Sequence, residues 1–67
     1  MIWTTEKRNQ AILNITDVII FESKTTIFMQ KELQYRMNII GLLITSPDEL
    51  LEANKEMIEK LGTLPNG

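Results

Sequence analysis

Apolar positions in the last third of the chain repeat with the period of a helix. At about 100° per residue, the apolar side chains between residues 47 and 61 gather on one side. They are Leu50, Leu51, Ala53, Met57, Ile58 and Leu61. Ser46 followed three residues later by Glu49 fits a capping box, and Gly62 is typical of a helix end. The pattern therefore predicts a helix over residues 47–61 and a frayed tail over residues 62–67.

The preceding part of the chain also follows a helical period, in two segments. The first segment has an apolar stripe of Ala11, Ile12, Ile15, Val18 and Ile19, opposite a polar stripe of Glu6, Gln10, Asn14 and Asp17. The second segment, residues 27–44, is apolar over most of its circumference and must be buried on more than one side. Glu32 and Arg36 interrupt it with the spacing of an i,i+4 ion pair. We place the break between the two helices near Ser23 and Lys24.

A small antiparallel sheet with one C-terminal helix is the alternative fold. Residues 18–21 and 25–28 are rich in β-branched and aromatic side chains, and residues 33–39 alternate between apolar and polar. Turns between strands usually need glycine or proline, however, and none occurs before Gly41 and Pro47. We therefore expect an all-α protein of two or three helices.

The size of the chain predicts that it associates with itself. A chain of 67 residues forms one domain, and its own core rarely stabilises it by more than about 3–5 kcal/mol. It has no cysteine for disulfides and no histidine for a metal site, whereas 43% of its residues are apolar. We expect a small helical homo-oligomer, a homodimer in its simplest form. In it Asn54 either fixes the register of a helix pair or lies at the boundary with its amide in water. The expected interface residues are Ile12, Ile15, Ile19, Met29, Leu33, Met37, Ile40 and Asn54.

The residue types argue against catalysis. Without cysteine and histidine, neither a cysteine nucleophile nor a His-based triad is possible. The three glycines, Gly41, Gly62 and Gly67, are too sparse for a phosphate-binding loop. Carboxylate pairs such as Glu52 and Glu56 are common on ordinary solvated helices. We expect no enzymatic activity, no metal and no cofactor.

Charge is distributed unevenly and points to protein partners. Residues 1–45 hold five basic and four acidic side chains, whereas residues 46–67 hold two basic and five acidic ones. A helix-turn-helix over residues 33–61 would turn this acidic end toward phosphates, so nucleic-acid binding is not expected. The candidate protein-binding residues are Asp48, Glu52, Glu56 and Glu59, together with Trp3. Tryptophan is enriched at interface hot spots, although Trp3 packed against its own domain is the alternative.

The longest apolar runs are too short to cross a bilayer, which needs about 18 or more apolar residues. No signal-peptide pattern is visible either, and we expect a cytoplasmic protein without membrane contact. The leading hypothesis is a small non-catalytic protein-binding module of the accessory or phage type. It would act as a homo-oligomer that regulates or inhibits a partner protein. The alternatives are a structural subunit of a larger assembly and a small transcriptional regulator that binds DNA as a dimer.

Overall fold

The protein is a bundle of helices. The structure, a computed structural model, describes residues 2–25 and 30–63. Every regular element in these two ranges is a helix, which confirms the all-α prediction and leaves the sheet alternative unsupported. The elements are α1 (Thr5–Thr25), α2 (Gln30–Thr45), α3 (Asp48–Ala53) and α4 (Lys55–Leu61).

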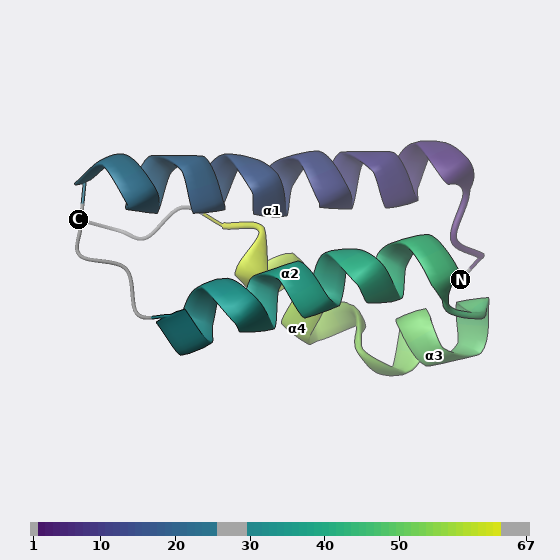
Figure 1. The fold of residues 1–67 in the computed structure, drawn as a ribbon. Coiled ribbons are helices and arrows are strands. Elements are labelled where there is room, and N and C mark those ends of the chain that lie inside the picture. The colour runs from purple at the N-terminus through teal and green to yellow at the C-terminus, as the bar shows by residue number, and fades with distance from the viewer. Residues whose placement is uncertain (1, 26–29, 64–67) are drawn as a thin grey trace.

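The two long helices form an antiparallel hairpin, and the two short ones fold back along it (Figure 1). At one end of the hairpin, Arg8 of α1 reaches the backbone carbonyl of Ser46, just beyond α2. Toward the other end, Glu22 of α1 pairs with Arg36 of α2. α4 contacts α1 and passes behind α2 in the view of Figure 1. The short helices therefore cover one side of the hairpin.

The predicted stripes of the first helix are confirmed. Ile15 and Val18 are buried, Ala11, Ile12 and Ile19 are partly buried, and the opposite polar stripe is exposed. Thr4 caps the helix, because its hydroxyl oxygen accepts the backbone N–H of Lys7 at 3.1 Å.

The predicted break at Ser23 and Lys24 is wrong, because α1 continues through both residues to Thr25. The hydroxyl of Ser23 donates to the carbonyl of Ile20 at 2.8 Å, inside the helix. That bond uses the hydroxyl within α1 instead of at the start of a new helix.

α2 is buried mainly where it faces α1 and α4. Ile39 and Leu43 are buried, whereas Met37 is 54% and Ile44 63% exposed. The apolar composition of α2 predicts burial on more than one side, but the single chain leaves part of its apolar surface exposed. The guanidinium of Arg36 pairs with the carboxylate of Glu22 on α1, 3.4 Å away, and both side chains are mostly buried.

The helix predicted over residues 47–61 is divided at Asn54. The side-chain amide of Asn54 donates to the carbonyl of Leu50 at 2.8 Å, the carbonyl that its own backbone N–H would use in a continuous helix. That N–H donates instead to the carbonyl of Leu51 at 3.2 Å. Such competition between an Asn side chain and the backbone ends α3, and α4 starts with the N–H of Ile58 on the carbonyl of Asn54.

The start of this region also differs from the prediction. The N-cap of α3 is Pro47, without a side-chain capping bond, so the capping box of Ser46 and Glu49 does not form. The N–H groups of Leu50 and Leu51 both donate to the carbonyl of Pro47.

The core is small and lies between the hairpin and the short helices. Its buried residues come from the N-terminal segment and from all four helices. They are Trp3, Ile15, Val18, Ile39, Leu43, Leu51 and Ile58.

Gly62 ends α4 where the chain passes close to α1. Its φ of −88° is accessible to any residue, so conformational freedom does not explain the glycine. Lack of space explains the glycine, because a Cβ at this position would lie 3.1 Å from the Cβ of Asn14. In the predicted frayed tail, Gly62 and Thr63 still hydrogen-bond to α4, and the remaining residues lie outside those described.

Replacement of Gly62 by valine is therefore expected to destabilise the fold. The branched side chain would push the end of α4 away from α1, at a cost of about 1–3 kcal/mol, the usual range for overpacking. Lys60→Val is the matched control, since it places the same side chain two residues earlier at an exposed position. Urea unfolding followed by circular dichroism measures both variants. Equal stability of the two would contradict the close approach of Gly62 to Asn14.

Candidate functional site

Trp3 lies in the core, not on the surface. Its side chain is only 4% exposed, and the ammonium of Lys7 sits 5.1 Å from the ring centroid. The indole Nε1 has no hydrogen-bond partner. Trp3 lines a small hollow of about 160 Å³ with Ala11, Ile58 and other residues. The ring is thus covered by its own chain, which fits the alternative in which Trp3 packs against its own domain. A role for Trp3 in binding a partner stays a prediction.

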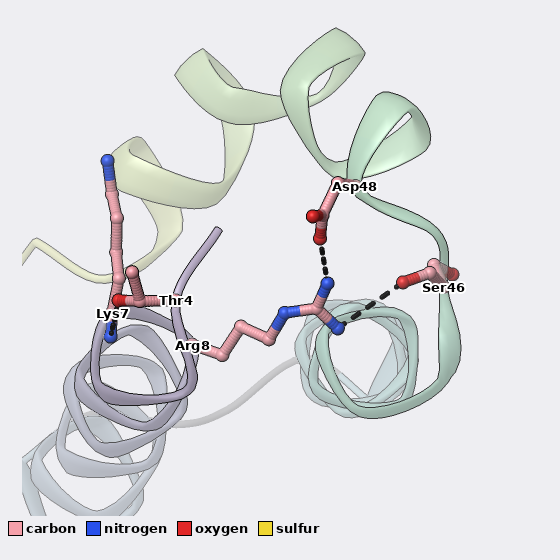
Figure 2. A network of polar contacts seen from close by, with 5 residues as sticks. All are labelled: Thr4, Lys7, Arg8, Ser46 and Asp48. Carbon is pink, nitrogen blue, oxygen red and sulfur yellow. Dashed lines mark hydrogen bonds and ion pairs between the residues drawn. The ribbon is translucent and has the colours of Figure 1, made fainter. Parts of the chain in front are cut away.

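Asp48 is joined to the hairpin by an ion pair. Its carboxylate pairs with the guanidinium of Arg8, which also donates to the carbonyl of Ser46 at 3.4 Å (Figure 2). The side chain of Asp48 is 44% exposed, so the pair contributes less than about 1 kcal/mol. Arg8 thereby holds the start of α3 against the first turns of α1. Asp48 serves this contact and does not stand among the free carboxylates of the predicted acidic surface.

Glu52, Glu56 and Glu59 stay exposed on the short helices. They line a shallow hollow of about 750 Å³, together with Lys55 and Met57. We call these three carboxylates the acidic face. Among the described residues, no group of three potential ligands lies close enough together to hold a metal ion. The acidic face is an exposed, negatively charged surface.

The predicted oligomer-interface residues differ in burial. Ile15 is fully buried within its own chain, and we assign it to the core of the single chain. Asn54 turns its amide to the Leu50 carbonyl, and Met29 lies outside the described residues. Ile12, Ile19, Leu33 and Ile40 are partly buried. Met37, at 54% exposure, is the most accessible member of the described set.

The exposed apolar residues that were not predicted as interface residues include Leu13, Ile20 and Ile44, at 56%, 47% and 63% exposure. Their helical positions turn them away from the side that α4 covers. That side is marked on α1 by Asn14, against Gly62, and on α2 by Tyr35, whose hydroxyl contacts the sulfur of Met57.

α1 and α2 each have a side that α4 does not cover, and the two helices lie side by side in the hairpin (Figure 1). A hollow of about 420 Å³ lies between them at the end near Arg8, and its lining residues are Trp3, Thr5, Arg8, Asn9, Ile12, Leu43 and Ile44. We call the uncovered sides of the two helices the hairpin face. Its most exposed apolar residues are Leu13, Ile20, Met37 and Ile44.

No protein-family model, curated protein or solved structure matches this chain. Within the described residues, no helix combines the length and the apolar character needed to cross a membrane.

Proposed function

We propose that this protein is a non-catalytic protein-binding module that acts as a homo-oligomer and regulates or inhibits a partner protein. The observation that supports this proposal is the hairpin face. Large apolar side chains that are exposed together mark interaction sites on small proteins. Here Leu13, Ile20, Met37 and Ile44 are each about half exposed or more, on two neighbouring helices.

The energy available at the hairpin face is large for so small a protein. Full burial of one such side chain stabilises by about 1.5–3 kcal/mol, so covering these four half-exposed ones contributes about 4 kcal/mol. That amount is similar to the whole stability expected for a core of this size. A binding partner therefore provides what the single chain lacks.

The acidic face is the second surface of the proposal. Glu52, Glu56 and Glu59 lie on α3 and α4, the helices that cover the other side of the hairpin. A module that associates through the hairpin face would keep these carboxylates in solvent. A partner with a basic surface fits them, and such charges act mainly on the rate and specificity of association.

Site-specific photocrosslinking in the native cells tests the proposed function. A photoreactive phenylalanine analogue replaces Met37 on the hairpin face, Glu56 on the acidic face or Asn38 as the control. Asn38 follows Met37 on α2 and is exposed on another side of the helix. We expect protein adducts from position 37 and position 56, and few from position 38. Adducts no more frequent at position 37 than at position 38 would contradict a binding role for the hairpin face.

A further inference from the structure

α3 is attached to the rest of the protein less firmly than the other described helices. α1 packs along α2 and contacts α4, whereas α3 makes only sparse contacts with these three helices. It is also the shortest of the four, with six residues. Regions with few buried contacts open at a lower free energy than the rest of a fold. α3 is therefore the described helix that opens most easily.

One buried side chain anchors α3. Leu51 has no exposed surface and belongs to the same core cluster as Trp3 and Leu43. The other side chains of the helix are exposed or partly exposed, and 45% of Leu50 is accessible. The hydrophobic contribution that keeps α3 in place thus comes mainly from a single residue.

α4 is only one residue longer than α3 but is anchored at more positions. Ile58 is buried, and Met57 and Leu61 pack against the core as partly buried side chains. Gly62, at the end of the helix, closely approaches Asn14 of α1. Opening of α4 would break all of these contacts, whereas opening of α3 alone would leave them in place.

An ion pair holds the first residue of α3. The carboxylate of Asp48 pairs with the guanidinium of Arg8, close to the start of α1 (Figure 2). Pro47, the N-cap, makes no side-chain hydrogen bond that would hold this end of the helix. Both charged side chains are partly exposed, so dissolved salt screens their attraction. The closed position of α3 therefore depends in part on ionic strength.

Asn54 separates α3 from α4. Its side-chain amide donates to the carbonyl of Leu50, and its backbone N–H donates to the carbonyl of Leu51. The hydrogen bonds of α4 then start with the N–H of Ile58 on the Asn54 carbonyl. Because Asn54 interrupts the regular helix, a change of its backbone angles can turn α3 without unwinding α4.

We propose that α3 is a lid over the end of the core where α1 begins and α2 ends (Figure 1). It opens as a unit, with Asn54 as its hinge and the ion pair of Arg8 and Asp48 as the contact that keeps it closed. Opening withdraws Leu51 from the core and gives water access to this end, while α1, α2 and α4 stay packed together. Salt favours the open state. The lid does not depend on a partner at the hairpin face.

Hydrogen exchange of the unaltered chain, resolved by NMR, tests the separate opening of α3. The N–H groups of Leu51 and Ile58 form a matched pair, because each donates to the carbonyl four residues earlier, at 3.2 and 3.0 Å. Both side chains are buried as well. We expect the protection factor of the Leu51 N–H to be at least about tenfold lower than that of Ile58. Equal protection of the two groups would overturn the lid.

Removal of the ion pair tests the contact that keeps the lid closed. Asp48→Asn takes away the carboxylate that pairs with Arg8, and Glu49→Gln removes an exposed carboxylate from the next position as the control. We expect Asp48→Asn to lower the protection of the Leu51 N–H about two- to fivefold and to leave that of Ile58 unchanged. Glu49→Gln is expected to change neither.

Salt provides the same test without a substitution. About 0.5 M salt is expected to lower the protection of the Leu51 N–H in the wild type and to have little further effect in Asp48→Asn. Equal effects of Asp48→Asn and Glu49→Gln would overturn the role of the ion pair. A loss of protection at Ile58 as large as that at Leu51 would show that the whole bundle opens, and would overturn the lid.

Discussion

Replacement of Leu43 by alanine is expected to unfold a large part of the protein population. Leu43 has no exposed surface and packs in the core between the hairpin and the short helices. Removing a buried leucine side chain costs about 2–5 kcal/mol, because apolar contacts are lost and a cavity remains. A core of this size supplies only about 3–5 kcal/mol, so the loss approaches the whole stability.

Leu50→Ala provides the matched control for this prediction. Leu50 lies on α3 with 45% of its surface exposed, so the same substitution there is expected to cost less than about 1 kcal/mol. Both variants are compared at one protein concentration by far-ultraviolet dichroism and urea unfolding. Similar losses of unfolding free energy in the two variants would contradict the placement of Leu43 in the core.

Trp3→Ala is expected to have the second large effect. Trp3 precedes α1, and its buried ring joins the N-terminal segment to the core residues of the helices. Truncation of a buried aromatic side chain costs about 3–5 kcal/mol. The loss comes from packing, since the indole Nε1 has no hydrogen-bond partner to give up.

Trp3→Phe separates the ring from its polar atom. Phenylalanine keeps most of the buried aromatic surface and removes an unsatisfied donor, so we expect it to be clearly more stable than Trp3→Ala. Urea unfolding monitored by dichroism compares the two variants. In the wild type, the single tryptophan provides a second signal, with emission that shifts to longer wavelength on unfolding. Equal destabilisation by Ala and Phe would contradict a packing role for the ring.

The helical fold could be predicted because its signals are local. The apolar stripe of α1 around Ile15 has the helical period, and the same residues are buried in the structure. The division at Asn54 was missed, because periodicity does not reveal which of two donors takes the Leu50 carbonyl. From the sequence alone, Asn54 stands out only as a candidate for fixing the register of a helix pair. Likewise, nothing in the spacing of Ser23 shows that its hydroxyl bonds inside α1.

The candidate surfaces were harder to predict, because they depend on which side of each helix its own chain covers. Arg8 and Asp48 are 40 residues apart, and only the tertiary fold joins them and removes Asp48 from the acidic face. The predicted interface followed the stripe that contains Ile15, which the single chain buries itself. The seven-residue spacing of Leu13 and Ile20 was a usable signal. This spacing indicates an exposed surface only once α4 is known to cover the opposite side of α1.

Sedimentation equilibrium of the unaltered chain tests the central claim most directly. Concentrations from about 1 to 500 µM cover the dissociation constants expected for an interface of this size. The account predicts that the chain associates reversibly within this range into a homo-oligomer, a homodimer in its simplest form. A chain that remains a helical monomer up to the highest concentration would contradict the proposed homo-oligomer.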